Sequence, residues 1–434
     1  MVEETRRYDV AILGAGAAGL VAAIRAAERG RSVIVLEKNR RAGVKILMSG
    51  GTRCNLTNAR GLRNLRVVSG PVDPGYDPRQ GQGSRSIQAA FGQGGGFLGP
   101  SLKALGVEQT VALFEGEGVA TKVEANGKVF PASDRAADVL DALLRRLERS
   151  GATLRTSSPV LGVEPMDLGF SIRTADAAIE ARRVIVAVGG QSFPGCGTCG
   201  DGYAIAKGFG HTIVEPKPAL VPIKVDVPWV TDLKGITVAD ARVGVIGREG
   251  SALLERREAV LFAHFGLTGP AILDVSRALA RYQGEEQLEL VIDWLPDVRP
   301  DALDQQIQTA SRNGRPSVAS LVPPAVPRRL AEALIGVAEI PPGRSGPELT
   351  RDERRRLVAA LKGLRLPAAG TLGFAKAEVT SGGVSLLEVD PETLESRRQA
   401  GLHFIGEVLD LDGLIGGYNF QAAWSTGWLA GNIV

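Results

Sequence analysis

A chain of 434 residues is too long for one ordinary hydrophobic core, so we expect two or three domains. Its composition, 44% hydrophobic and 23% charged, predicts a globular protein, and no apolar run is long enough to span a bilayer. The N-terminus lacks a signal-peptide core and three cysteines give no disulfide framework, so we expect a cytoplasmic location. The net charge of +3 gives no electrostatic reason to expect a nucleic acid or a membrane as partner.

The strongest motif lies between Tyr8 and Glu37. An apolar run from Val10 to Leu13 leads into a G-x-G-x-x-G turn, an alanine-rich helical pattern follows, and Ser32–Leu36 is a second apolar run. This order predicts a βαβ unit of a parallel, Rossmann-like sheet, and therefore an α/β protein.

The glycines of this turn have separate roles in dinucleotide binding. Gly14 permits the tight turn, Gly16 lets the backbone approach a pyrophosphate, and Gly19 lets the helix pack close to the sheet. Ala17 begins the helix, whose free N–H groups favour phosphate. Glu37 ends the second strand, where a carboxylate accepts hydrogen bonds from a ribose and disfavours a 2′-phosphate.

The next segment, from Lys38 to Asn58, is rich in Gly, Ser, Asn and cations and has little apolar period. We interpret it as a functional loop in which Lys45 and Arg53 neutralise a diphosphate; the alternative is a solvated loop. Residues 63–96 are rich in Gly, Gln, Pro and Arg, and we expect a mobile excursion there.

Regular structure resumes after that excursion. An apolar stripe from Val139 to Leu147 predicts a helix capped by Ser133 or Asp134 and ended by Gly151. The runs expected to extend the parallel sheet are Thr153–Thr156, Val160–Val163 and Arg183–Val188, the last of which includes Ala187 and leads into Gly189.

The following C-x-x-C pair, Cys196 and Cys199, permits a redox dithiol or a metal site, although a plain glycine-rich turn is the default interpretation. Further ligands are scattered, so we expect no metal. Pro194 stands where a nucleophile elbow needs glycine, which argues against Ser192 as a hydrolase nucleophile.

Proline spacing and short alternating runs predict a change of architecture after residue 214. We expect a first cofactor-domain segment at 1–214, an inserted antiparallel β domain at 215–298, a helical insert at 299–366 and a second cofactor-domain segment at 367–434. In the β insert, His264 lies beside a glycine-rich bend, where it could face a substrate or serve the fold.

The C-terminal segment returns to the nucleotide. A strand candidate ends at Gly406-Glu407, and Gly416-Gly417-Tyr418-Asn419 opens a final helix. A helix N-terminus aimed at the ligand stabilises negative charge on the pyrimidine edge of a reduced flavin, from which a nicotinamide gains nothing. The sequence therefore favours FAD.

Five blocks now carry a family resemblance: GVKILMSGGTRCNLTN, VAVGGQSFPGCGTCGDGYAIAKGFGH, FAHFGLTGPAILDVS, AEVTSGGVSLLEVDPETLES and GLHFIGEVLDLDGLIGGYNFQAAWSTG. They resemble, in the same order, the signatures of a bacterial family of FAD-dependent oxidoreductases, the aminoacetone-oxidase-like or BaiN-like flavoproteins. The resemblance implies a discontinuous Rossmann-like FAD-binding domain interrupted by a β-barrel-like insert and a small helical subdomain.

The resemblance also assigns residues. It places Ala18 and Lys38 with the glycine motif on the adenosine diphosphate half and Val160, through its backbone, at the adenine. Motif and resemblance together predict these cofactor contacts: Gly14, Gly16, Ala17, Ala18, Gly19, Glu37, Lys38, Lys45, Ser49, Gly50, Arg53, Cys54, Asn55, Val160, Ala187, Gly189, Gly406, Glu407, Gly416, Gly417, Tyr418 and Asn419. The chain departs from the family at Cys199, where threonine is usual, and in its unusual 63–96 stretch.

The expected activity is hydride transfer through flavin N5, specifically reduction of a conjugated C=C bond in a small molecule with NAD(P)H as transient donor. His264 and Arg53 are the candidates for polarising or protonating substrate. An amine oxidase that uses dioxygen and a non-catalytic or RNA-associated flavoprotein are the alternatives. The sequence leaves the oligomeric state open.

Overall fold

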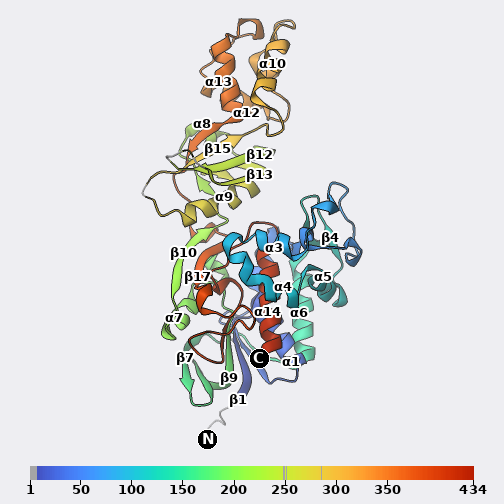
Figure 1. Cartoon of the computed structure of the whole chain (residues 1–434), viewed down its shortest axis with the longest axis vertical. Helices are drawn as coiled ribbons and strands as arrows, with labels where there is room; N and C mark the ends of the chain where they lie inside the picture. The colour runs from blue at the N-terminus through green and yellow to red at the C-terminus, as the bar shows by residue number, and fades with distance from the viewer. Residues whose placement is uncertain (1–6, 248–249, 251, 285) are drawn as a thin grey trace. The chain divides into compact units, whose positions relative to one another are not determined.

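The structure is a computed structural model that describes residues 7–247, 250, 252–284 and 286–434. The chain divides into two compact units (Figure 1). The first contains the chain up to Lys217 together with Val379–Val434, and the second is Pro218–Glu378.

The first unit is built on a sheet with strand order β6-β2-β1-β9-β8-β7, to which β18 adds by pairing with β9. Strands β1, β2, β6, β9 and β18 are parallel, and Leu13 lies level with both Leu36 and Val186. The strands are β1 Arg7–Leu13, β2 Val33–Leu36, β6 Thr153–Arg155, β7 Val160–Met166, β8 Gly169–Thr174, β9 Ala178–Val186 and β18 Leu402–Phe404. The expected α/β Rossmann-like fold is confirmed.

Strand β7 corrects one expectation, because it pairs antiparallel with β8 and β8 pairs antiparallel with β9. Only two residues, Asp167 and Leu168, separate β7 from β8. So short a connection reverses the chain, whereas a parallel pair needs a long crossover.

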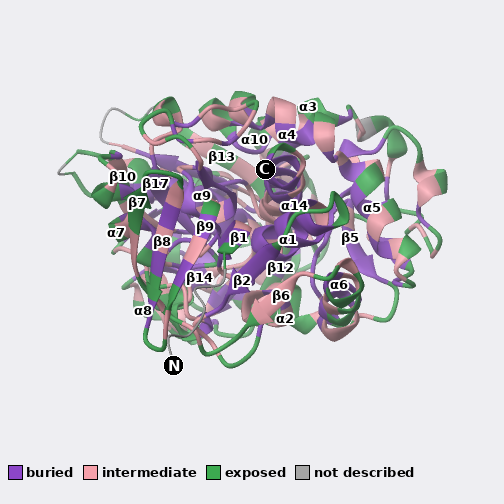
Figure 2. Cartoon of the chain, turned by 90° about the horizontal axis from the view of Figure 1, so that it is seen from below, coloured by how far each residue is buried: buried purple, intermediate pink, exposed green. Residues whose placement is uncertain are grey.

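Three helices, α1 Ala17–Glu28, α6 Ala136–Ser150 and α14 Tyr418–Ile433, share one buried apolar cluster with β1 and β2. Figure 2 shows the buried residues along β1, α1 and α14. The helix predicted from the apolar stripe is therefore confirmed as α6, and Gly151 ends it at φ 79°. The predicted cap is wrong: Arg135 is the N-cap, and no side chain caps the helix.

Glycines bring α14 against α1. A Cβ on Gly427 would lie 2.4 Å from the carbonyl oxygen of Ala18, and one on Gly431 would lie 2.7 Å from that of Ala22. Because both pairs advance by four residues, the two helices run in the same direction, and their N-termini point the same way.

The first unit also contains a smaller sheet of order β3-β5-β4 and several short elements. The remaining helices and strands are α2 Val44–Thr52, β3 Thr57–Asn58, α3 Ser84–Ala89, α4 Gly99–Ala104, α5 Val107–Gly116, β4 Thr121–Val123, β5 Lys128–Pro131, α7 Asp201–Gly208, β10 Ile213–Ala219 and β17 Val379–Val384. Strand β10 pairs with β17. The expectation of a mobile excursion at 63–96 is wrong, because Tyr76, Ile87 and Phe91 of this stretch are at most 6% exposed and belong to an apolar cluster.

The second unit joins an antiparallel six-stranded sheet, β11-β14-β13-β12-β15-β16, to helices over one apolar cluster. Its elements are β11 Ile223–Lys224, α8 Pro228–Asp232, β12 Thr237–Ile246, β13 Ala252–Ala263, β14 Gly266–Thr268, α9 Pro270–Arg281, β15 Glu289–Asp293, α10 Pro300–Ser311, α11 Val318–Leu321, α12 Arg328–Val337, α13 Arg351–Lys362 and β16 Leu364–Pro367. None of the helices among the described residues has the length and apolar character needed to cross a membrane.

Candidate cofactor site

The glycine-rich turn after β1 leaves room on one side only. A Cβ on Gly14, whose φ is +98°, would lie 2.7 Å from the carbonyl oxygen of Ala187, and one on Gly19 would lie 2.0 Å from that of Gly14. A Cβ on Gly16 would meet no atom within 4 Å. Gly14 and Gly19 are therefore required for packing, whereas Gly16 borders open space at the N-terminus of α1.

No side chain caps the N-terminus of α1, so its first N–H groups are available to a ligand. Glu37 fixes the turn beside them, because its carboxylate accepts hydrogen bonds from the N–H groups of Ala15 at 2.8 Å and Asn39 at 2.9 Å. An uncapped helix start with a neighbouring glycine and a fixed backbone suits a pyrophosphate.

The end of β18 reaches the same place. A Cβ on Gly406, whose φ is +68°, would lie 3.0 Å from the Cβ of Ala18. The next residue, Glu407, accepts hydrogen bonds at 2.6 Å from Lys45 Nζ and from Ser192 Oγ, and at 3.0 Å from the N–H of Thr380. Lys45 also donates to Ser192 Oγ at 2.7 Å. These contacts join four separate parts of the chain next to the start of α1.

The loop expected to approach the flavin has a strained backbone. Helix α2 spans Val44–Thr52, yet within it Ser49 is extended (ψ 151°) and Gly50 and Gly51 are left-handed. Thr52 (φ 68°) and Cys54 (φ 61°) are left-handed as well, which is unfavourable for residues with a side chain. Such strain persists where the surroundings impose it, and it is common at ligand sites.

Cys54 within this loop is fully buried, and burial raises the pKa of its thiol to about 12. The thiol therefore stays protonated at neutral pH and does not act as a nucleophile. Its predicted contact with the cofactor stays a prediction.

The same loop contacts the N-terminus of α14. In the amide orientation that satisfies its neighbours, Asn55 accepts a hydrogen bond from the N–H of Gly417 at 2.9 Å. Asn58 donates from Nδ2 to the carbonyl oxygen of Gly416 at 2.9 Å. Gly417 is the N-cap of α14 at φ 91° and, as a glycine, supplies no capping side chain of its own to the N–H groups that follow it.

The two helix starts fit the two ends of one extended ligand. Gly427 lies beside Ala18. Tyr418 precedes Gly427 by nine residues and Ala17 precedes Ala18 by one, so α14 begins roughly 12 Å before α1 along their common direction. One N-terminus can therefore receive a pyrophosphate and the other a ring that carries negative charge. The residues present fit FAD.

Other predicted residues lie apart from these contacts. Arg53 pairs with Glu124 at 2.6 Å and Asp134 at 3.4 Å, and its guanidinium stacks 3.9 Å from the ring centre of Phe130. Lys38 forms an ion pair with Asp201. Their roles toward a ligand stay predictions.

Val160 begins β7, two residues after Ser158, whose N–H donates to the carbonyl oxygen of Glu37 at 2.8 Å. Gly189, at φ +76°, follows β9, and a Cβ there would lie 3.0 Å from Thr198 Cγ2. His264 is exposed at the turn between β13 and β14 and belongs to the second unit. Its proposed role toward substrate also stays a prediction.

Three residues of the site were missed from the sequence: Ser192, Thr380 and Asn58. Ser192 follows the glycines after β9, which was a usable signal, because polar residues just past a parallel strand face the ligand edge of such sheets. Thr380 and Asn58 each lie within a block that carries the family resemblance, but neither was singled out there. Cys196, in the C-x-x-C pair, places its Sγ 3.2 Å from the Sδ of Met48. Among the described residues there is no cluster of three His, Cys, Asp or Glu side chains suited to a metal.

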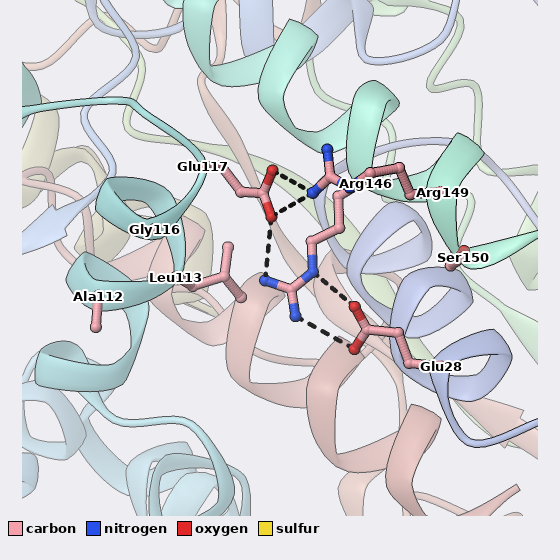
Figure 3. Close-up of a pocket in the computed structure, with 8 residues that line it drawn as sticks. All are labelled: Glu28, Ala112, Leu113, Gly116, Glu117, Arg146, Arg149 and Ser150. Carbon is pink, nitrogen blue, oxygen red and sulfur yellow. Dashed lines mark hydrogen bonds and ion pairs between the residues drawn. The ribbon is translucent and has the colours of Figure 1, made fainter.

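A hollow of about 340 Å³ lies elsewhere in the first unit, between α1, α5 and α6 (Figure 3). It is lined by ion pairs: Arg146 binds Glu28 at 2.8 Å, and Arg149 binds Glu117 at 2.6 Å. Glu28 ends α1, roughly 17 Å from the glycine turn. None of the predicted cofactor contacts lines this hollow, and its charges are neutralised within it.

The glycine turn, the parallel sheet and the two aligned helix starts define a dinucleotide-binding protein of the flavoprotein type. The chain belongs to the HI0933-like family: the family model described as HI0933-like protein Rossmann domain matches residues 8–69 and 82–433. It is an FAD-dependent oxidoreductase, as the sequence predicted.

Two curated relatives span almost the whole chain. The ribosomal RNA dihydrouridine synthase of Escherichia coli K12 is 34% identical over 422 residues, 97% of this chain and 96% of its own length. The 3-dehydro-bile acid delta(4,6)-reductase of Clostridium scindens is 33% identical over 428 residues, 97% of this chain and 98% of its own length. Among solved structures, a 3-ketosteroid-delta4-(5alpha)-dehydrogenase from Rhodococcus jostii RHA1 has the same fold, with a TM-score of 0.52, 15% identity, and coverage of 99% of this chain and 98% of that one.

Proposed function

We propose that this protein reduces a carbon–carbon double bond conjugated with a carbonyl group, with FAD as hydride carrier and NAD(P)H as donor. The observation that carries the proposal is the chemistry shared by the two full-length relatives. Dihydrouridine is uridine with the ring C=C bond next to a carbonyl saturated, and a delta(4,6)-reductase of a 3-oxo bile acid acts on C=C bonds conjugated with that carbonyl. Substrates that differ so much in size have this bond in common.

The chain supports such a reaction by binding and electrostatics. The open space at Gly16 and the uncapped start of α1 suit the pyrophosphate, and Glu407 with Lys45 suits the polyol that follows it. The start of α14 would stabilise negative charge on the pyrimidine edge of a bound flavin. When bound, FAD supplies hydride transfer at N5.

The overall reaction consumes one NAD(P)H and one proton for each bond reduced. The hydride adds to the carbon β to the carbonyl, the proton adds to the α carbon, and NAD(P)⁺ and the saturated carbonyl compound leave. A proton donor is thus required, and His264 and Arg53 remain the sequence-based candidates for helping at this step.

Uracil within RNA is a second candidate substrate. The specific observation that favours it is the similarity to the E. coli relative, which is named for ribosomal RNA. Our expectation that nucleic acid is not a partner rested on the small net charge, and it stays a prediction. An amine oxidase that reoxidises its flavin with dioxygen is the remaining alternative.

The test begins with anaerobic mixing of the purified flavoprotein with NADH or NADPH in a stopped-flow instrument. We expect the flavin absorption near 450 nm to bleach, and then to recover on addition of an enone or of a uridine-containing RNA. Recovery with only one acceptor assigns the substrate class. A flavin that neither nucleotide reduces, but that an amine does, would replace the proposal by the oxidase alternative.

A further inference from the structure

Between its two matched segments the family model leaves twelve residues of this chain unmatched, 70–81, and these lie in the unusual glycine- and arginine-rich stretch. The structure gives them a defined place at the edge of the small β3-β5-β4 sheet. Val72 pairs in parallel with Val123 of β4, the N–H of Gly70 donates to the carbonyl oxygen of Thr121 at 2.8 Å, and the N–H of Asp73 donates to that of Val123 at 2.9 Å. The segment therefore adds an edge to the sheet.

A tight turn then directs Tyr76 back over the molecule. The side chain of Asp73 accepts from the N–H of Gly75 at 2.8 Å, and its carbonyl oxygen accepts from the N–H of Tyr76 at 3.0 Å. As a result Tyr76 is only 6% exposed, although the residues on both sides of it are not buried. Burial of the Tyr76 side chain therefore holds this otherwise exposed segment in place.

Tyr76 lies beside the same glycine as Asn58, a residue that contacts the start of α14. A Cβ on Gly127 would lie 3.2 Å from Tyr76 Cε2 and 3.0 Å from Asn58 Oδ1, so both side chains close over this glycine. The other end of the Asn58 amide holds the carbonyl oxygen of Gly416 at 2.9 Å. Gly416, at φ +129°, in turn leaves space for the ring of Tyr418, whose Cε2 would lie 3.2 Å from a Cβ there.

Tyr76 and Tyr418 share one apolar cluster, and Tyr418 is 5% exposed. Burial raises the pKa of the Tyr76 hydroxyl, and the charge of Tyr418 when ionised raises it further, whereas Arg60 lowers it. The Tyr76 hydroxyl thus stays protonated at neutral pH.

We propose that Tyr76 is a positioning residue that this chain adds to the flavin end of its site: through Asn58 it holds the Gly416–Tyr418 turn in place, and so sets which acceptor fits there. The effect on which acceptor binds rests on the proposed function, whereas the effect on the bound flavin does not.

The test compares Tyr76→Ala with Tyr76→Phe, which keeps the ring. The matched control is Tyr8→Ala, because Tyr8 is also 6% exposed and belongs to the same apolar cluster, but lies near the beginning of β1, roughly 17 Å from Leu13. The measurements are the visible spectrum and dissociation constant of FAD, the rate of flavin reduction by NADPH, and KM and kcat for 2-cyclohexen-1-one as probe.

We expect Tyr76→Ala to shift the flavin band and to raise KM for the probe by about tenfold, with little change in flavin reduction by NADPH. Tyr76→Phe should restore both, and Tyr8→Ala should change neither. If Tyr76→Ala does not fold, Tyr76→Leu takes its place. Identical flavin spectra and KM values in the Tyr76 and Tyr8 variants would overturn the proposal. If neither NADH nor NADPH reduces the wild-type flavin, the proposed function fails, and the flavin spectrum and FAD dissociation constant still decide the role of Tyr76.

Discussion

Two glycines of the same turn should respond in opposite ways to a single added carbon. Gly16→Ala should leave the stability of the FAD-free protein nearly unchanged, because the new Cβ meets open space, yet weaken FAD binding by about tenfold or more, since the methyl occupies the approach of the pyrophosphate. Gly19→Ala should destabilise the FAD-free protein by about 1–3 kcal/mol, because its Cβ would lie 2.0 Å from a backbone oxygen. Thermal unfolding and a flavin titration separate the two effects.

The contacts of Glu407 give a second prediction. Glu407→Gln removes the charge that holds Lys45 and Ser192, so we expect FAD to bind about tenfold more weakly. Asp304→Asn is the matched control, because it breaks the ion pair with Arg354 (2.6 Å) in the second unit. Equal loss of FAD affinity in both variants would show that the effect is general destabilisation.

At this scale the sequence predicted those residues whose role follows from local spacing. Gly14, Gly16 and Glu37 stand in a fixed order around one turn, and the structure brings them together with Gly406 and Lys45. The sequence could not show that Thr380 or Asn58 joins them, because the contacts of these two residues connect parts far apart in the chain. Nor could it show that Arg53 stacks on Phe130, since the partner belongs to a strand beyond the intervening segment.

The relative position of the two ends of the site depends on the parallel packing of α1 against α14. Gly427→Ala should destabilise the protein by about 1–3 kcal/mol, because its Cβ would lie 2.4 Å from the carbonyl oxygen of Ala18, and should weaken FAD binding as the helix starts move apart. Gly336→Ala in α12 is the control: nothing lies within 4 Å of its Cβ, so the added helix propensity should stabilise by about 0.5–1 kcal/mol. Denaturant unfolding of both variants checks the signs.

Periodicity identified elements better than it identified their partners. The apolar stripe of α6 and the buried runs of β1, β2 and β9 lie where they were expected, because local pattern determines them. The direction of β7 depends on a two-residue connection that the short run 160–163 does not reveal. Composition misled at 63–96, because a few buried aromatic and aliphatic side chains order a segment that is otherwise rich in Gly, Pro and Arg.

For the whole molecule, two buried histidines predict acid sensitivity. Burial lowers the pKa of His211, against the opposing effect of Glu388, and lowers that of His403, against Glu395. Below about pH 6.5 the unfolded chain therefore binds protons that the folded protein does not, so the free energy of unfolding should fall as pH falls. Urea unfolding at pH 7.5 and 5.5 measures the slope.

His211→Gln should reduce that slope, whereas His264→Gln, which changes an exposed histidine, should leave it as in the wild type. Around His211 lie Ser396, Glu388, Arg398 and Phe404. Arg398 and the Thr212 N–H and hydroxyl lower the pKa of Glu388 to about 2, so that carboxylate loses its own contribution only in stronger acid.

The chain leaves the second unit where it entered it, since the N–H of Glu378 donates to the carbonyl oxygen of Leu220 at 3.1 Å. To the first unit the whole insert is thus a closed loop, and the entropy of closing a loop rises only with the logarithm of its length. Replacing residues 221–377 by a short glycine–serine turn should leave a protein that still shows a bound-flavin spectrum. By the same reasoning, the insert could be lost, lengthened or exchanged during evolution at little cost to the cofactor site.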